Sequence, residues 1–346
     1  MKALQLVATR RMDVAEVPAP QEVGPEDIMV RVKAIGVCGS DMHYYRGEGA
    51  GNAALDYPFI MGHEFAGVVE AIGQRVTSAQ VGDRVAVDPA MPCGHCEYCL
   101  EGNPNLCPAM RFSGSPGVAG AMQDLVVQPA HTAFKMPDSM SFAQGAVLEP
   151  LGVALHSLNL GKVHIADTVA VIGCGPIGLM IAQLARLAGA QDVFVAEVVE
   201  HRLRMAERMG VSLAVDSRRA DPVKAIVNAT HGRGVDVAFE VAGAVETSEQ
   251  AAEVCKGGGT VVVTGICGED RMDFRAGITR RKGLTIKVCR RMKHVYGRTI
   301  PLVHRKMVNI DALVTHTFPL AQGGEAFRIL DTYEDEVGKV VLINEG

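Results

Sequence analysis

The sequence predicts a two-domain α/β protein, in which an antiparallel β domain precedes a doubly wound domain with a parallel sheet. The chain has 346 residues, more than one ordinary hydrophobic core accommodates. Up to residue 150, short alternating apolar runs are separated by turn pairs, a pattern typical of antiparallel strands. Beyond Gly161, continuous apolar runs alternate with helical stretches, which indicates buried parallel strands joined by helices.

The elements expected from these patterns define three segments: a first domain over residues 1–150, a second over 151–291, and a C-terminal segment over 292–346 that returns to the first domain. Strands of the first domain are expected at residues 28–34 and 66–72. The second domain has candidate strands at 169–172, 193–196, 235–239 and 260–263, and helices near 179–187 and 201–209. The last segment has a helical stretch near 296–306 and a strand near 339–343.

Composition indicates a soluble protein that acts on a small molecule. The formal net charge of −5 and a pI near 6.1 exclude the strong positive field that would gather nucleic acid. Residues 168–185 carry no charge, but they contain several glycines and Pro176, so a strand, turn and helix explain them better than a membrane span. The N-terminus lacks the pattern of a signal peptide, and we expect a cytoplasmic protein.

A glycine-rich loop follows the first predicted strand of the second domain. Gly173, Gly175 and Gly178 form a G-x-G-x-x-G pattern, with Pro176 and Ile177 between the last two. The first glycine permits a tight turn, the second lets the backbone approach a pyrophosphate, and the third lets helix and strand pack closely. This context predicts a Rossmann domain that binds a dinucleotide at a helix N-terminus.

Glu197 ends the second of these strands, where an acidic side chain accepts hydrogen bonds from the adenosine ribose and repels a 2′-phosphate. We therefore expect NAD rather than NADP, although Arg202 could soften this preference. The alternative is a strand-end carboxylate without a ligand. Cys174, inside the loop, is interpreted as a small apolar filler.

The nine cysteines are not expected to form disulfides in a reducing compartment. Four of them crowd together at spacings that suit a closed tetrahedral zinc site: Cys93, Cys96, Cys99 and Cys107. A full thiolate shell leaves no open coordination position, so this zinc should be structural. His95, between two of the cysteines, is interpreted as a solvated loop residue.

A second metal site would combine distant residues: Cys38, His63, and an acidic group from Glu64 or Glu149. Each alone is weak evidence, because a solitary cysteine is usually a buried small hydrophobe and a lone histidine is seldom a ligand. Together they supply sulfur, nitrogen and oxygen donors and leave room for water or substrate, which is the composition of a catalytic zinc site.

With these motifs in order, the chain resembles the medium-chain zinc-dependent alcohol dehydrogenases, specifically the polyol (sorbitol, xylitol) branch. The segments that carry the resemblance are residues 38–44, 61–67, 81–85, the four-cysteine segment, 149–151, the glycine loop and 313–320. The resemblance implies a GroES-like catalytic domain, a Rossmann NAD-binding domain and two zinc ions per chain, one catalytic and one structural.

The resemblance also implies roles for single residues. Cys38 and His63 would bind the catalytic zinc, with Glu64 or Glu149 as the acidic candidate; which of the two binds directly stays open. Ser40 matches the hydroxyl that relays the proton, and His43 matches the residue that passes it to solvent. Asp41 is a candidate to orient a ligand histidine.

Substrate recognition rests on fewer positions. Tyr44, Phe112, Glu149 and Arg291 align with positions that border substrate in the polyol branch, and Ile266 and Arg291 are further candidates for cofactor contacts. Two positions depart from that branch, because Met292 replaces a tyrosine and Arg290 an aromatic residue. The substrate could therefore be an aldonate, an inositol-like ring or an amino alcohol, and the adjacent arginines could bind a carboxylate.

Three other interpretations compete with this one. A threonine, sugar-acid (idonate-like) or simple alcohol dehydrogenase would share both zincs and NAD. A cofactor-binding protein without catalysis is disfavoured, because the candidate metal and relay residues are all retained. A nucleic-acid-binding zinc module is disfavoured by the acidic charge balance. The resemblance further implies a homodimer or homotetramer.

Overall fold

The computed structural model describes residues 1–48, 56–269 and 271–345. The chain forms two compact units, one of residues 1–150 with the segment from Tyr296 onward, and one of Leu151–Val295. The second unit thus ends slightly beyond the boundary at 291 inferred from the sequence.

The second unit is built on a six-stranded sheet in which every pairing is parallel. Its strand order is β12-β11-β10-β13-β14-β15, so the order reverses beside β10, where a doubly wound sheet binds its ligand. The strands are β10 (Thr168–Ile172), β11 (Asp192–Glu197), β12 (Leu213–Asp216), β13 (Val235–Glu240), β14 (Cys255–Val263) and β15 (Thr285–Val288).

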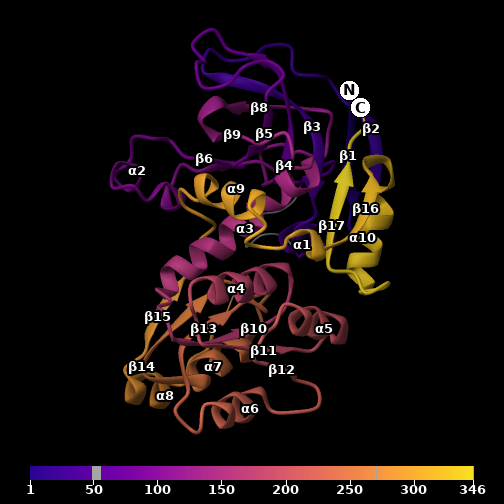
Figure 1. The fold of residues 1–346 in the computed structure, drawn as a ribbon. Coiled ribbons are helices and arrows are strands. Elements are labelled where there is room, and N and C mark those ends of the chain that lie inside the picture. Colours follow the sequence, from indigo (N-terminus) through magenta and orange to yellow (C-terminus); the bar gives the residue numbers. More distant parts are fainter. Residues whose placement is uncertain (49–55, 270, 346) are drawn as a thin grey trace. The chain divides into compact units, whose positions relative to one another are not determined.

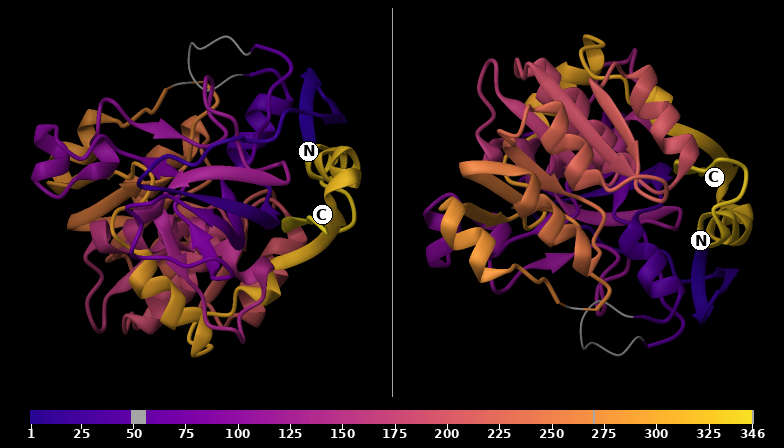
Figure 2. Two further views of the ribbon diagram at one scale, coloured as in Figure 1. Left: turned by 90° about the horizontal axis from the view of Figure 1, so that it is seen from above. Right: turned by 90° about the horizontal axis from the view of Figure 1, so that it is seen from below.

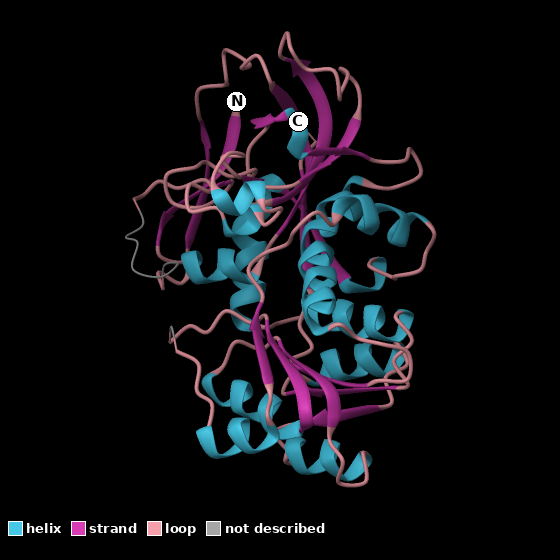
Figure 3. Ribbon diagram, turned by 90° about the vertical axis from the view of Figure 1, so that its left-hand side faces the viewer, coloured by secondary structure: helices cyan, strands magenta, loops and turns pink. Residues whose placement is uncertain are grey.

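Helices lie on both faces of this sheet (Figure 3). The central strands are therefore buried on both sides, which explains their continuous apolar runs. Large core side chains include Phe194, Ile226 and Val261. The helices are α4 (Pro176–Leu187), α5 (Glu200–Arg208), α6 (Pro222–Ala229), α7 (Val245–Val254) and α8 (Ala276–Lys282).

The first unit contains a seven-stranded sheet of order β16-β17-β3-β4-β5-β9, in which β8 also pairs with β3 (Figure 1). All pairings are antiparallel except that of β16 with β17. One face of β3 is fully buried through Ile28, Val30 and Val32, which fits the alternating sequence pattern. The strands are β3 (Asp27–Gly36), β4 (Glu64–Ile72), β5 (Arg84–Val87), β8 (Leu125–Pro129), β9 (Ala133–Lys135), β16 (Val314–Pro319) and β17 (Lys339–Ile343).

The C-terminal segment completes this sheet, because β17 pairs with β3 through Val341 and Gly36. Helix α10 (Gly323–Thr332) packs against β2 (Arg11–Glu16), so the end of the chain lies beside its beginning (Figure 2). The predicted fold class, an antiparallel β domain with a Rossmann-type parallel-sheet domain, is confirmed.

The remaining elements are short, apart from α3 (Phe142–Gly161), a long helix that contains Pro150 and was not predicted. They are β1 (Lys2–Ala8), β2 (Arg11–Glu16), β6 (Ala90–Met91), β7 (Arg111–Phe112), α1 (Gly39–Tyr45), α2 (Glu97–Leu100) and α9 (Tyr296–His304). Among the described residues, no helix combines the length and apolar character needed to cross a bilayer.

Candidate active site and metal centres

The first unit brings Cys38, His63 and Glu64 together, with one donor atom of each within 4.8 Å of the others. Cys38 follows β3 and caps the N-terminus of α1, whereas His63 and Glu64 stand at the start of β4. Because β3 and β4 are antiparallel neighbours, Gly36 at the end of β3 lies directly opposite Glu64 at the start of β4. A pairing of strands thus assembles residues that are distant in the sequence.

Asp41 fixes the geometry of this cluster. Its Oδ2 accepts a hydrogen bond from the Cys38 backbone N–H at 2.9 Å, and its Oδ1 lies 3.5 Å from Nδ1 of His63. Burial alone would lower the pKa of His63, but the charges of Asp41 and Cys38 outweigh it and raise this pKa well above its ordinary value. Oδ1 of Asp41 makes no hydrogen bond among the described residues, so its contact with Nδ1 is an ion pair, which leaves Nε2 of His63 for a metal.

Glu64 is fully buried, at 0 % exposure, and its partner is the equally buried Lys339 of β17. The Lys339 ammonium forms an ion pair with Oε2 of Glu64 and donates to the backbone oxygen of Val37 at 2.8 Å. In the described part of the chain, neither carboxylate oxygen of Glu64 accepts a hydrogen bond, and Oε1 has no ion-pair partner either. Oε1 is therefore available to a cation.

Glu149 lies in α3, is buried, and is not a member of the Cys38, His63 and Glu64 cluster. Burial is the main cause that raises its pKa to about 8; the charge of His63 opposes this shift and that of Glu64 adds to it. Burial therefore favours the protonated form of the Glu149 carboxyl group, which can donate a hydrogen bond.

The cluster fits a catalytic zinc. It offers a thiolate, an imidazole held through its other nitrogen, and a carboxylate oxygen without a hydrogen bond, which are the donor types of such sites. The Phe112 ring lies 5.2 Å from the His63 ring, centroid to centroid, and supplies an apolar wall beside this ligand. A fourth protein ligand would fill the coordination shell of the zinc and exclude substrate. This cluster offers only three donors, so one coordination position stays open for water or substrate.

The two candidate relay residues share α1. Ser40 and His43 are three positions apart, which places them on one side of the helix. Nδ1 of His43 lies 2.5 Å from Oε2 of the exposed Glu48, so His43 connects this helix to a solvated carboxylate. Tyr44, a candidate substrate residue, is buried and meets Phe59 edge to face at 5.5 Å.

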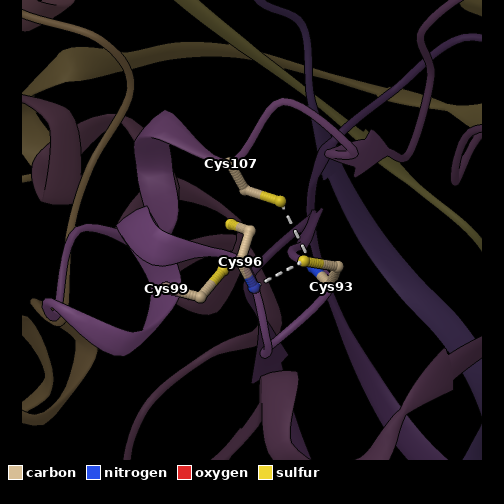
Figure 4. Close-up of side chains that lie close together, drawn as sticks. All are labelled: Cys93, Cys96, Cys99 and Cys107. Carbon is tan, nitrogen blue, oxygen red and sulfur yellow. Dashed lines mark hydrogen bonds between the residues drawn. The ribbon is translucent and has the colours of Figure 1, made fainter.

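A second metal cluster consists of the predicted four cysteines, whose sulfur atoms all lie within 4.8 Å of one another: Cys93, Cys96, Cys99 and Cys107 (Figure 4). Backbone N–H groups of His95 and Cys96 point to Sγ of Cys93 and lower the pKa of this thiol to about 6. The imidazole of His95 instead contacts the Cys93 carbonyl oxygen at 2.8 Å. Among the described residues no cysteine forms a disulfide.

In the second unit the glycine loop lies between β10 and α4, which begins at Pro176, earlier than the helix expected from the sequence. Gly173 has φ +102°, a conformation that favours glycine. A Cβ at Gly178 would overlap the Gly173 carbonyl oxygen, whereas one at Gly175 would meet only Arg202, at 4.0 Å. Thus Gly178 serves packing, and Gly175 leaves the loop open for a ligand such as a diphosphate.

Glu197 braces this loop, a role that the sequence analysis missed. Its Oε2 accepts the Cys174 N–H at 2.7 Å, and its Oε1 accepts those of Val198 and Val199 at 2.7 and 3.1 Å. Nη1 of Arg202 lies 3.9 Å from Oε2 of Glu197. The carboxylate and the guanidinium are therefore neighbours beside the loop.

The other predicted contacts of cofactor and substrate also belong to the second unit. Ile266 is 66 % exposed, and Arg291 has φ +54°, a backbone conformation that non-glycine residues rarely adopt. Met292 is buried, and its side chain stands where a Cβ on Gly152 of α3 would lie. Met292 is thus a packing residue within this unit.

Sequence reasoning missed Lys339. The only signal was a lysine at the head of an otherwise apolar strand, which ordinarily indicates an exposed strand end. Its partner, Glu64, is 275 positions earlier in the sequence, so no local pattern predicts the pair.

The comparisons with known proteins agree with this architecture. Residues 24–138 match the alcohol dehydrogenase GroES-like domain, and residues 176–305 match the zinc-binding dehydrogenase domain. The chain is 33 % identical to sorbitol dehydrogenase of Bacillus subtilis over 99 % of this chain and 97 % of that protein. It is 32 % identical to D-xylulose reductase of Saccharomyces cerevisiae over 100 % and 98 % of the two chains.

A solved structure from Sinorhizobium meliloti 1021, assigned as a zinc-binding dehydrogenase and bound to NADP, superposes with a TM-score of 0.91. It is 32 % identical and covers 99 % of this chain and 98 % of its own. The two matched domains and the near-full-length similarity to named dehydrogenases thus indicate the same family. The chain belongs to the medium-chain, zinc-dependent alcohol dehydrogenase family and is an NAD-dependent oxidoreductase of the alcohol or polyol type.

Proposed function

We propose that the protein oxidises a secondary hydroxyl group of a polyol, such as sorbitol, xylitol or galactitol, with NAD as the hydride acceptor. The observation that carries this proposal is the buried Cys38, His63 and Glu64 cluster, whose composition suits a catalytic zinc. Similarity to a sorbitol dehydrogenase and a D-xylulose reductase over almost the whole chain supports the polyol substrate.

Zinc would supply Lewis-acid stabilisation of the substrate oxygen, and NAD would accept the hydride. The residues of the chain would orient these partners and move the proton. Asp41 holds His63 through Nδ1, and Cys38 through its backbone, so both ligands are positioned in advance. Ser40 would take the substrate proton, and His43 would pass it toward Glu48 and solvent.

We assign the acidic ligand to Glu64 and a proton-donating role to Glu149. Glu64 belongs to the cluster and has an oxygen without a hydrogen bond, whereas Glu149 lies outside the cluster and has a pKa raised to about 8. A protonated Glu149 can donate to a substrate hydroxyl or to water and needs no counter-cation. This division of roles predicts a larger loss of metal from Glu64→Gln than from Glu149→Gln.

A sugar acid is the second candidate substrate. Arg290 and Arg291 occupy adjacent positions and Arg290 is exposed, so they could recognise a carboxylate by paired hydrogen bonds. Substitution Arg290→Met should then reduce turnover of idonate-like acids much more than turnover of neutral polyols. Equal losses on both substrate classes would remove the acid as a candidate.

The cofactor preference follows from Glu197. Its carboxylate would disfavour the 2′-phosphate of NADP, while Arg202 beside it would moderate that preference. The same family membership supports a homodimer or homotetramer in the cytoplasm, which light scattering and cell fractionation would test.

The deciding experiment is an NADH absorbance assay across polyols, sugar acids, threonine, inositols and ethanol, with zinc-replete and chelator-treated protein. We expect chelator-sensitive oxidation of a polyol. Cys38→Ser and His63→Ala should abolish it while leaving NAD binding in place, because both residues lie outside the dinucleotide-binding unit. Normal turnover by either variant would refute the metal assignment.

A further inference from the structure

Lys339 is a cation buried at 3 % exposure, next to the candidate metal ligands, and the proposed chemistry does not use it. It stands at the first position of β17, the strand that pairs with β3 just before Cys38. Its ammonium group contacts the Val37 carbonyl oxygen at 2.8 Å and Oε2 of Glu64. A lysine is rarely so buried unless it is paired.

The charges around Lys339 explain why it is there. The ammonium group lies against the Glu64 carboxylate, and both side chains are buried. Glu64 has no other ion-pair partner in the described part of the chain. Without Lys339, the Glu64 carboxylate would be a buried anion with no counter-charge, which is strongly unfavourable.

The two oxygens of Glu64 have different surroundings. Oε2 lies in the space left by the missing side chain of Gly36 and forms the ion pair with Lys339, whereas Oε1 has neither an ion-pair partner nor a hydrogen bond among the described residues. A metal ion on Oε1 and the ammonium on Oε2 would be two cations on one carboxylate. They would repel each other, and each would reduce the electron density that Glu64 offers to the other.

We propose that Lys339 is a positioning residue that acts as the resident counter-ion of Glu64 and sets the metal affinity of this site. It keeps the metal-free site folded and weakens the binding of zinc, so the Cys38, His63 and Glu64 site exchanges its metal more readily than the four-cysteine site. This inference rests on the proposed metal site. Beyond that site, it predicts that removal of the buried Lys339 cation strengthens zinc binding.

The test compares zinc affinities of wild type, Lys339→Met and Lys339→Arg by competition with a chromophoric chelator, with zinc as the probe. Cobalt(II) titration distinguishes the two sites, because four thiolates absorb more strongly than one. Lys339→Met should bind zinc at the first site about tenfold more tightly or more, and should unfold at a lower temperature when metal-free. Lys339→Arg should restore the wild-type affinity, and the four-cysteine site should not change.

A purely structural lysine predicts the opposite sign, because its loss would disorder Glu64 and weaken metal binding. Weaker or unchanged zinc affinity in Lys339→Met therefore overturns the proposal. If Lys339→Met does not fold, the comparison is between Glu64→Gln and the double variant Glu64→Gln/Lys339→Met, because the double variant buries no unpaired charge. The double variant should bind zinc more tightly than Glu64→Gln. Equal or weaker binding overturns the proposal. Failure of the site itself is distinguishable, since Cys38→Ser would then leave the metal content unchanged.

Discussion

Substitution of Gly36 by alanine should destabilise the first unit, although the backbone at this position accepts an alanine. Gly36 lies in β3 and is not among the residues with positive φ. A glycine-to-alanine change in such a conformation ordinarily stabilises a protein by about 0.4–1 kcal/mol, because it restricts the unfolded chain. Here, however, the added Cβ would overlap Oε2 of Glu64 and lie 3.1 Å from both Cβ and Cδ of that residue.

The loss of folding free energy can be estimated from the ion pair that the added Cβ would disrupt. The Glu64 carboxylate would have to leave the ammonium of Lys339, and breaking a buried ion pair costs about 3–5 kcal/mol. After subtraction of the gain from the unfolded state, the net loss is about 2–4 kcal/mol. For a unit of this size such a loss lowers the melting temperature by about 5–15 °C.

Thermal unfolding by circular dichroism, together with the zinc content per chain, measures this effect. Gly297→Ala is the matched control: Gly297 lies in α9 and a Cβ there meets nothing within 4 Å, so this variant should gain up to about 1 kcal/mol. In a Glu64→Ala background, Gly36→Ala should lose most of its effect. A Gly36→Ala protein that melts at or above the wild-type temperature with full zinc content would refute the reasoning.

Three further substitutions have expected outcomes. Cys99→Ser should remove one zinc per chain and lower the melting temperature, with little change in NAD affinity; retention of both zincs by elemental analysis would contradict a structural site. Glu197→Gln should weaken the binding of both cofactors by loosening the glycine loop, and should weaken NAD more than NADP because the charge that repels the 2′-phosphate is removed; an unchanged ratio of the two dissociation constants would mean that another group reads the ribose. Burial would raise the pKa of Asp236, but Arg233 and Lys256 lower it below the ordinary 3.8. The stability that Asp236 provides is therefore present above pH 3.8 and is lost as the pH falls through the lowered pKa. The difference in melting temperature between wild type and Asp236→Asn should shrink from pH 7 to pH 3, and a constant difference would contradict the ion pairs.

The second unit could be predicted well because its signals are local. Buried parallel strands have continuous apolar sequences, and residues 168–172 and 235–240 show this without reference to any partner. The glycine loop is equally local, since Gly173 and Gly178 are constrained by the turn that they themselves form. Helix α3 was missed because Pro150 is a signal for a helix end, and burial of the surrounding apolar residues overrides that signal.

For the metal cluster the sequence predicted Cys38, His63 and one of two carboxylates, with Asp41 to orient the histidine, but it did not predict the pairing of Glu64 with Lys339. Which carboxylate joins Cys38 and His63 depends on the register of β3 against β4, and this register places Glu64 opposite Gly36. The loop brace of Glu197 depends in the same way on where its two oxygens point after folding. Such contacts join residues that are far apart in the sequence, so each residue alone resembles an ordinary polar side chain.

These distant contacts also determine which substitutions are informative. Removing a ligand such as Cys38 would abolish activity under any model in which that residue matters, so its loss says little about mechanism. Gly36 and Lys339 carry no donor atom to the metal, yet they determine where the Glu64 carboxylate lies and what charge it faces. Opposite signs are therefore expected from the two positions: Gly36→Ala should displace the carboxylate and weaken metal binding, whereas Lys339→Met should free it and strengthen metal binding. A site that merely needed intact packing would lose metal in both variants, so the pair of measurements separates electrostatic control of Glu64 from general disruption.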